Sequence, residues 1–471
     1  MPLRIDILIY ERAILRYMET YGLKRILGLR SAIIINLGAI IGAGIFVIIG
    51  IAAGKAGPAI IVSIFVSAII AIFTGLSFSE IAQHISKEGG VYEYAKESFA
   101  PSAGFIGGTM WTFSNMIAIS AVSLSTGSYI NSLFHLHIDL IVFGIPVIIM
   151  FAILNMLGIK NSAKTLSILV GINIAILIIF VVSGLFYFKL GDFSNFAPHG
   201  FTGIMEGSAL IFFAFTGFSR ITTIGDEVKN PEKNIPKAII ISIIISSALY
   251  SIVAIVAIGL IPSSNLALAS APLSAAIAVL HNPYILIIVA IGGITATAGV
   301  VLTGILGTSR VLYAMGRDRE IPGTFGRIDK FGTPFYSILL SMSISLLFVY
   351  FVGFSTIIEA SNVSVLIAYS IIDFSAIMLW RNVKTDNPKH LREQKYFFVI
   401  PIIGMATIFI TISYLGLHAI EISLAVLALV SGIYAIKHIM ESGGYIRKAK
   451  KIIPAYSKVR LFGRSRQQIK K

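Results

Sequence analysis

The chain has 471 residues, of which 56% are hydrophobic and only 13% are charged. This balance excludes a water-soluble globular protein, because so few charged groups cannot cover a water-facing surface of that size. The chain contains no cysteine, which excludes thiol catalysis, cysteine-ligated metals and a disulfide-linked subunit.

Apolar segments long enough to cross a membrane fill most of the chain. A helix needs about 20 apolar residues to cross a hydrocarbon layer of about 30 Å. Residues 1–30 lack the apolar core of a signal peptide, so we expect a cytoplasmic N-terminal segment there. The pattern after it predicts an all-α integral membrane protein with twelve transmembrane helices, near residues 31–53, 57–82, 100–133, 138–158, 165–190, 204–224, 237–261, 285–312, 334–353, 356–380, 396–417 and 420–440.

The basic residues define the two sides of the membrane. Only Lys55 and Lys189 lie in the predicted outer loops, and Arg220 lies within a span. The rest of the 37 lysines and arginines fall in the inner loops, the two tails or the adjoining ends of the spans, which is the positive-inside pattern. We therefore expect a multi-pass protein of the cell membrane with both termini in the cytoplasm.

Residues 441–471 form a strongly basic tail, which contributes to the net charge of +15. Such a tail can bind nucleic acid, but directly after a membrane span the simpler use is attraction to anionic lipid headgroups. We expect membrane lipid, and no nucleic acid, as its partner.

The order of the spans suggests a single transporter domain at 31–440 with two halves of five helices, about 31–190 and 204–380, followed by two further helices. No clear sequence repeat relates the halves. The first helix of each half contains glycine and small residues, which is typical of inverted-repeat transporters with discontinuous helices.

Glycines interrupt the first span at mid-membrane depth, at Gly38, Gly42 and Gly44. Glycine weakens the helix there, and backbone freed at this depth is tolerated only where it lines a cavity or is buried in protein. A half-helix N-terminus facing such a cavity attracts a carboxylate, which predicts a substrate-binding site. The alternative is that Gly38 and Gly42 only allow close helix packing. A dinucleotide motif is disfavoured, because no strand or βαβ unit surrounds the glycines.

The sixth span contains a small and aromatic stretch, Phe212–Phe218, around Gly217. Its rings are suited to cover the apolar part of a bound solute. The alternative is that they face lipid or pack against other helices.

Four sequence blocks, in this order and spacing, resemble the amino acid-polyamine-organocation (APC) transporter superfamily. They are Gly38–Phe46; Ser79–Glu80 with Gly89–Tyr94; Phe213–Phe218 followed by Asp226–Pro236; and Ser309–Asp318 with Ile321 and Pro322. The resemblance covers residues from about Leu27 to Trp380.

The resemblance implies a LeuT-type fold, with a 5+5 inverted repeat, discontinuous helices 1 and 6, and additional helices 11 and 12. Main-chain amides of helix 1 would bind the carboxylate of an amino acid, and main-chain carbonyls of helix 6 its ammonium group. The candidate substrate-binding residues are Ile41, Gly42, Ala43, Gly44, Phe213, Ala214, Phe215 and Gly217. The resemblance also implies that Arg310, Arg317 and Asp318 latch an inner gate.

One departure from the family pattern concerns the coupling ion. Several relatives place a lysine in the fifth helix against the first, whereas this chain has Asn173 at the matching place. A neutral amide does not titrate, so proton coupling there is in doubt. A sodium site with Thr297 or Thr303 as oxygen donor is the alternative. The coupling ion, H⁺ or Na⁺, stays open, and we expect no cofactor or resident metal.

A second departure is the presence of two charged residues within spans, Arg220 and Asp373. Charges inside a membrane are costly and are usually paired or functional. At about 1.5 Å per residue, each lies about 10–12 Å from the inner boundary. They are candidates for a gating or proton-linked pair. The alternative is that each reaches separately into an aqueous vestibule.

The sequence thus predicts a secondary active transporter for amino acids, with an uncharged pocket suited to neutral or apolar side chains, acting as a monomer or homodimer. The alternatives are an amino acid exchanger and a sensor that binds without transport. A membrane enzyme is disfavoured, because the spans show neither paired aspartates nor a histidine-rich metal set.

Overall fold

A computed structural model of the protein describes residues 25–42, 44–85, 87–351, 354–382 and 398–440. The chain divides into two compact units, one up to Ser423 and one from Leu424 onward. The described residues are almost entirely helical, with one isolated bridge between Leu27 and Val228.

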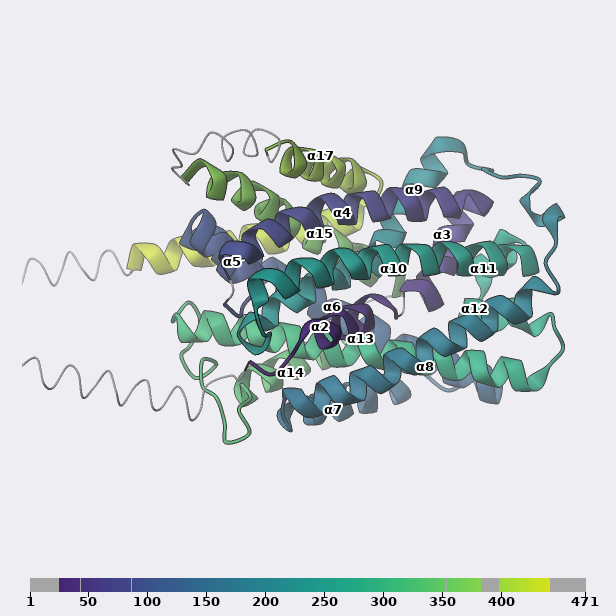
Figure 1. The fold of residues 1–471 in the computed structure, drawn as a ribbon, viewed down its shortest axis with the longest axis horizontal. Coiled ribbons are helices and arrows are strands. Elements are labelled where there is room, and N and C mark those ends of the chain that lie inside the picture. Colours follow the sequence, from purple (N-terminus) through teal and green to yellow (C-terminus); the bar gives the residue numbers. More distant parts are fainter. Residues whose placement is uncertain (1–24, 43, 86, 352–353, 383–397, 441–471) are drawn as a thin grey trace, which may run out of the picture. The chain divides into compact units, whose positions relative to one another are not determined.

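Figure 1 labels the principal helices, and their bounds show where the chain changes direction. In chain order the first unit contains α2 (Leu29–Ile40), a π-helix (Gly44–Ile48), α3 (Ile49–Ala56), α4 (Ile60–His84), α5 (Val91–Ser98), α6 (Pro101–Phe134), α7 (Ile141–Met156), α8 (Ile159–Leu185), α9 (Gly200–Phe215), a 3₁₀-helix η4 (Thr216–Glu227), α10 (Pro231–Leu260), α11 (Ser263–Leu268), α12 (Pro272–Ala278), α13 (Pro283–Arg317), α14 (Phe335–Phe351), α15 (Phe354–Asn382) and α17 (Val399–Ser413), with short 3₁₀ turns at Gly57–Ala59 and Leu190–Phe193.

Among the described residues, eight helical runs are long and apolar enough to cross a membrane, and three shorter apolar helices accompany them. The first run, Leu29–His84, covers two of the spans predicted from the sequence. These runs support a multi-pass membrane protein. The total of twelve spans stays a prediction.

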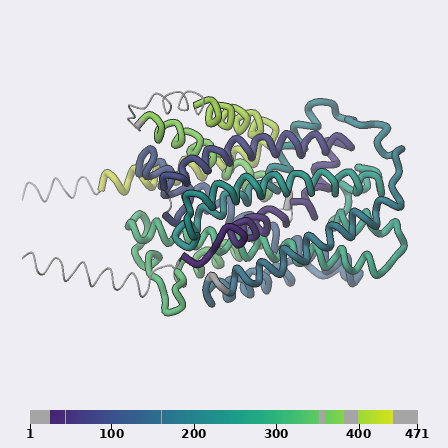
Figure 2. The backbone as a smooth tube through the Cα atoms, viewed as in Figure 1, coloured from purple at the N-terminus to yellow at the C-terminus, as the bar shows by residue number. Residues whose placement is uncertain are grey.

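The long helices of the first unit run alongside one another, as Figures 1 and 2 show. Helix α13 packs against α6, and α4 packs against α10. The short α5 lies at one end of this bundle, while α11 and α12 lie at the other end (Figure 1). The bundle therefore has two distinct ends joined by long apolar helices.

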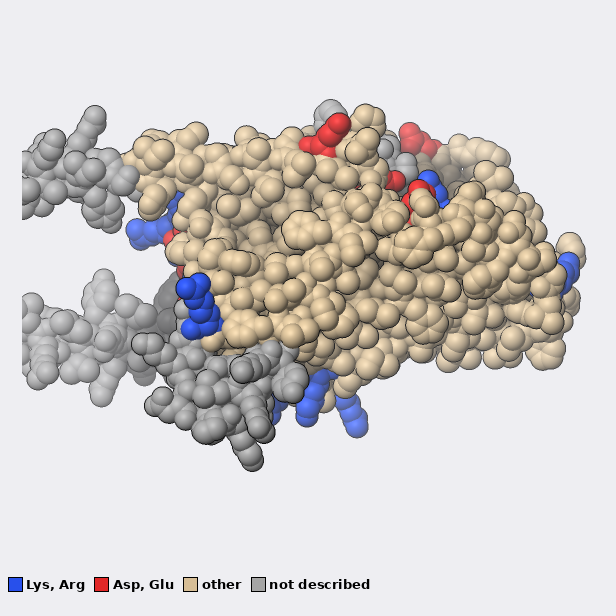
Figure 3. All heavy atoms as spheres, turned by 90° about the horizontal axis from the view of Figure 1, so that it is seen from above, with Lys and Arg blue, Asp and Glu red and all other residues tan. Residues whose placement is uncertain are grey.

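Large apolar side chains also lie on the outside of the bundle. On α8, for example, Ile178, Val182 and Leu185 are each more than half exposed. Charged side chains occupy only small, separate patches on the face shown in Figure 3. Such a surface would be unfavourable in water but suits contact with lipid tails.

Candidate functional site

The first predicted interruption lies between α2 and the π-helix. Helix α2 ends at Ile40, Ile41 has an extended backbone with ψ of 94°, and helical structure resumes at Gly44. Ala43, one of the predicted binding residues, lies outside the described residues. The first turn of any helix leaves its amides without partners inside that helix. Here the amide of Phe46 donates to the carbonyl of Gly42 at 3.3 Å, across the interruption.

The second interruption differs from the open turn expected in helix 6. Helix α9 ends at Phe215 and the chain continues as the tighter 3₁₀-helix η4, with a kink at Ile224. Hydroxyl groups explain this tightening. Thr216 donates to the carbonyl of Phe213 at 2.9 Å, and Thr222 and Thr223 likewise donate three residues back. Such local bonds compete with the regular α-helical pattern.

Glycines bring the two interruptions into direct contact. A Cβ atom on Gly44 would lie 2.2 Å from the Cβ of Ala214, and one on Gly217 would lie 2.2 Å from the carbonyl oxygen of Ala39. Gly42 packs equally closely on Val300 of α13. Close approach, rather than a left-handed backbone, is what requires glycine at these positions.

Three buried tyrosines hold the carbonyl groups at the interruptions. Tyr250 of α10 donates to the carbonyl of Ile40 at 2.6 Å, and Tyr369 of α15 donates to that of Thr216 at 2.6 Å. Tyr129 of α6 donates to the carbonyl of Phe46. Each hydroxyl thus satisfies a main-chain acceptor where the chain leaves α-helical geometry. The sequence analysis missed all three, because a single tyrosine in an apolar span carries no distinguishing pattern.

The predicted helix 6 residues are buried beside these tyrosines. Phe215 packs on Tyr250, with ring centres 5.4 Å apart. The carbonyl of Phe213 accepts from Thr216, and that of Ala214 lies 3.5 Å from the Tyr250 hydroxyl. The carbonyl of Phe213 also accepts from the backbone amide of Thr216, so the Thr216 hydroxyl and amide use both of its lone pairs. The carbonyl of Ala214, with its long contact to Tyr250, is the better placed of the two to accept from an ammonium group.

Arg220 is buried, with 4% of its surface exposed, and its hydrogen-bond partners among the described residues are neutral. Its guanidinium donates to the side chain of Asn115 at 3.0 Å, to the carbonyl of Val300 at 3.1 Å and to the hydroxyl of Thr303 at 2.8 Å. These groups come from α6 and α13. Arg220 therefore does not reach into an aqueous vestibule.

Asp373 points elsewhere, so the structure does not join it to Arg220. It is fully buried, and within the described residues neither carboxyl oxygen has a hydrogen-bond partner. A Cβ atom on Gly404 of α17 would lie 2.7 Å from one of these oxygens. The structure therefore supports neither hypothesis: Arg220 and Asp373 do not form a pair, and neither side chain reaches separately into an aqueous vestibule. The rise per residue of a helix predicts that the two residues lie at a similar depth, but it does not predict the direction in which either side chain points.

We expect the effects of Arg220→Ala and Asp373→Asn on transport to be additive. The two side chains have no shared partner, and independent sites contribute separately. The measurement is the initial rate of amino acid uptake in each single variant and in the double variant. A double variant as active as either single variant would contradict this placement.

The three other candidate coupling residues have different partners. Thr297 lies 2.8 Å from the hydroxyl of Thr126, Thr303 accepts from Arg220, and Asn173 accepts from Thr295. The α8 side chains that face Gly38 of α2 are Leu166 and Val170, not Asn173. The structure therefore does not bring these three residues together as one ion site.

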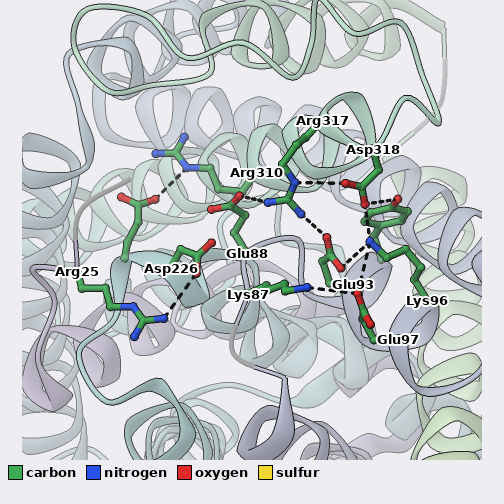
Figure 4. Close-up of polar contacts among 12 residues, drawn as sticks. Arg25, Lys87, Glu88, Glu93, Lys96, Glu97, Asp226, Arg310, Arg317 and Asp318 are labelled. Atoms are coloured by element: carbon green, nitrogen blue, oxygen red, sulfur yellow. Dashed lines mark hydrogen bonds and ion pairs between the residues drawn. The ribbon is translucent and has the colours of Figure 1, made fainter. Parts of the chain in front are cut away.

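A charged cluster lies at the α5 end of the bundle and joins α5, the loop before it, η4 and α13 (Figure 4). Arg317 binds Glu88 at 2.6 Å and also pairs with Glu93 and Asp318. Lys96 pairs with Glu93 at 2.9 Å and with Asp318. We define the charged cluster as Glu88, Tyr92, Glu93, Lys96, Glu227, Arg310, Arg317 and Asp318.

Within the charged cluster, Arg310 and Glu227 form a fully buried ion pair at 3.0 Å. Arg310 is on α13, whereas Glu227 ends η4, the segment that follows the second interruption. Tyr92 adds a hydrogen bond to Asp318 at 2.8 Å. The cluster therefore ties the interrupted helix and the α5 region to α13 at one end of the bundle.

We expect Glu88→Gln to flatten the pH dependence of stability. Burial, and then the nearby carboxyl of Asp226, raise the pKa of Glu88 well above its ordinary value of 4.5, although Arg317 opposes them. An acid whose pKa is raised in the folded state stabilises that state. This stabilisation is complete at pH values below the ordinary pKa and is lost as the pH rises through the raised pKa. The wild-type unfolding temperature should therefore fall relative to that of Glu88→Gln as pH rises above 4.5.

The control for this prediction is Glu97→Gln, at a more exposed carboxyl that pairs with Lys87 at 3.4 Å. Unfolding temperatures of the three proteins are to be measured in detergent across the pH range. Parallel curves for wild type and Glu88→Gln would contradict the raised pKa.

Comparisons with known proteins agree with this architecture. The family model for amino acid permeases matches residues 27–435. The branched-chain amino acid permease BcaP of Bacillus subtilis is 31% identical over 388 residues, 78% of this chain and 83% of that protein. The methylthioribose transporter of the same organism is 30% identical, over 77% and 82% of the two chains. The cationic amino acid transporter 9 of Arabidopsis thaliana is 27% identical, over 65% and 58%.

These relatives are transporters, and the matching model spans both interruptions and the charged cluster. The chain is therefore a member of the amino acid permease family, within the APC superfamily.

Proposed function

We propose that the protein is a secondary active transporter that carries neutral or apolar amino acids across the cell membrane by alternating access. The observation that carries the proposal is the contact between the two interruptions, at Gly44 with Ala214 and at Gly217 with Ala39. Main-chain groups at two such breaks are suited to bind both ends of a zwitterion. In this proposal twelve spans form two inverted halves of five plus two helices, and both termini are cytoplasmic.

The side chains at the interruptions favour an uncharged substrate. Ile41, Phe213 and Phe215 are apolar and buried. Arg220, a cation on η4 shortly after the second interruption, is already held by three neutral groups. The similarity to a branched-chain amino acid permease supports leucine, isoleucine and valine as the first substrates to test.

The charged cluster supports alternating access. If the end of the bundle that carries it faces the cytoplasm, the pair of Arg310 with Glu227 and the contacts of Arg317 close that side. Release of substrate there requires η4 and α5 to separate from α13. The cluster would then act as the inner gate.

The test is uptake of labelled leucine by the purified full-length chain in proteoliposomes. We expect saturable uptake that unlabelled isoleucine and valine reduce. The panel of competitors should include the other common amino acids and also methylthioribose, because one relative carries that name. Uptake competed only by methylthioribose, or neither binding nor uptake of any amino acid, would overturn the proposal. Uptake that requires internal amino acid would identify an exchanger.

We also expect uptake to be independent of sodium. The hydroxyl of Thr303, a predicted sodium ligand, accepts a hydrogen bond from the Arg220 guanidinium at 2.8 Å. A second cation beside that fixed positive charge would be repelled. Replacing external Na⁺ by K⁺ should therefore leave the leucine uptake rate unchanged. A rate that rises and saturates with Na⁺ would contradict this expectation.

A further inference from the structure

Within the described residues, a buried acid without an ion-pair partner lies inside the bundle at Asp373. Its side chain is fully buried, and within the described residues neither oxygen makes a hydrogen bond. It precedes Arg381 by eight residues on α15, which is about 12 Å of helix. An ionised carboxylate at that depth, without a partner, is strongly unfavourable, so the packing seen here requires a proton on this group.

Within the described residues, no charged side chain of the helices packed on α15 forms an ion pair with Asp373. Among the described residues that face Asp373 are Ser77 of α4, through its hydroxyl group, and Gly404 of α17. Helices α6 and α17 contain no acidic, basic or histidine side chain.

Ionisable groups on three other neighbouring helices, α4, α9 and α5, are held elsewhere. On α4, Glu80 accepts from Gln83, and the ring of His84 bonds the carbonyl of Glu80. On α9, Glu206 pairs with Lys55. On α5, Glu93 pairs with Lys96, and Glu97 pairs with Lys87. None of these ion pairs, all within the described residues, includes Asp373.

Asp373 is one helical turn from a residue that contacts the second interruption. Tyr369, four residues earlier on α15, donates to the carbonyl of Thr216 at 2.6 Å and to the hydroxyl of Ser219 at 2.8 Å. Its ring also packs on Phe78 of α4 and Phe218 of η4, with centroid distances of 5.2 Å to both. Phe78 follows Ser77, which faces Asp373. The interface of α4 with α15 thus joins Asp373 to the start of η4.

We propose that Asp373 is the proton-binding group that couples substrate movement to a proton gradient, a proposal that rests on the proposed transport function. One proton from the outer side binds the carboxylate and permits the close packing of α15 on α4 and α17. Loss of that proton to the inner side leaves a carboxylate that must gain water. α15 then separates from these helices, and Tyr369 carries the movement to η4. One proton enters and one leaves in each cycle.

The experiment compares wild type, Asp373→Asn and Glu359→Gln in proteoliposomes. The asparagine mimics the protonated acid in size and charge, and Glu359→Gln is a matched acid-to-amide control on the same helix. With one proton per leucine, an inward gradient of one pH unit supports about tenfold accumulation. We expect that accumulation in wild type and Glu359→Gln. The Asp373→Asn variant should show no accumulation of leucine, but it should still exchange leucine across the membrane in the absence of a pH gradient. Gradient-driven accumulation by Asp373→Asn would overturn the proposal.

A second measurement is independent of transport. The infrared band of a buried protonated carboxyl group should be present in the wild-type protein and absent from Asp373→Asn. Identical spectra would overturn the proposal even if transport were lost. Absence of both accumulation and exchange of any amino acid by the wild type would instead refute the proposed function, and the infrared comparison would still decide whether Asp373 carries a proton.

Discussion

Gly217→Ala should reduce leucine uptake to below about one-tenth of the wild-type rate, because a misplaced binding group readily costs that factor. The added methyl group would lie 2.2 Å and 2.4 Å from the carbonyl oxygen and carbon of Ala39, and 2.9 Å from the amide nitrogen of Ile40. All three atoms belong to the backbone and cannot rotate away. The two interruptions must therefore separate, which displaces the main-chain groups proposed to bind the substrate.

The control for this prediction is Gly171→Ala on α8, where a Cβ atom would meet nothing within 4 Å. Both changes add the same methyl group, and in a helix alanine is intrinsically favoured over glycine by about 1 kcal/mol. Uptake rates and protein amounts in the membrane are to be measured together. Wild-type uptake by Gly217→Ala would show that the contact between the interruptions is not needed.

Arg310→Met should destabilise the folded protein by about 3–5 kcal/mol, the usual cost of leaving one buried charge without its partner. Arg310 and Glu227 are both fully buried, and their atoms Nε and Oε1 are 3.0 Å apart. The double variant Arg310→Met with Glu227→Met should lose less stability than Arg310→Met alone, because it leaves no isolated charge. Chemical unfolding in detergent, followed by circular dichroism, measures the free energies.

The control for this second prediction is Lys87→Met, which removes a partly exposed pair with Glu97 at 3.4 Å. Exposed pairs contribute about 0–1 kcal/mol, so this change should have little effect. Equal losses in Arg310→Met and in the double variant would contradict a stabilising role for the buried pair.

The sequence predicts the apolar runs and the first interruption well, because both depend on local composition. Lipid contact requires long apolar stretches, and Gly42 and Gly44 weaken the helix beside Ile41, where α2 has ended. The same glycines also pack closely on Val300 and Ala214, so the packing alternative describes part of what they do.

The parts that the sequence does not predict depend on side-chain direction. Tyr129, Tyr250 and Tyr369 reach carbonyls on other helices more than 80 positions away in the chain, and no local pattern shows this. The separation of Arg220 from Asp373 has the same cause, because depth follows from position in a helix but direction follows from packing.

The charged cluster is predicted in part from the sequence. Arg310, Arg317 and Asp318 are identified by resemblance to the family. Their partners on other elements, chiefly Glu227, Glu88 and Lys96, require the folded structure. Acidic residues in the inner loops have no spacing that assigns each to a particular arginine or lysine.

The proposed function requires that main-chain groups of the two interrupted helices bind both charged ends of an amino acid. The most direct measurement is the shift in unfolding temperature of the purified protein with leucine, with 4-methylpentanoate, which lacks the amino group, and with 3-methylbutylamine, which lacks the carboxylate. A ligand that binds only the folded state raises its stability. We expect stabilisation by leucine and by neither analogue at the same concentration. Equal stabilisation by either analogue would contradict this prediction.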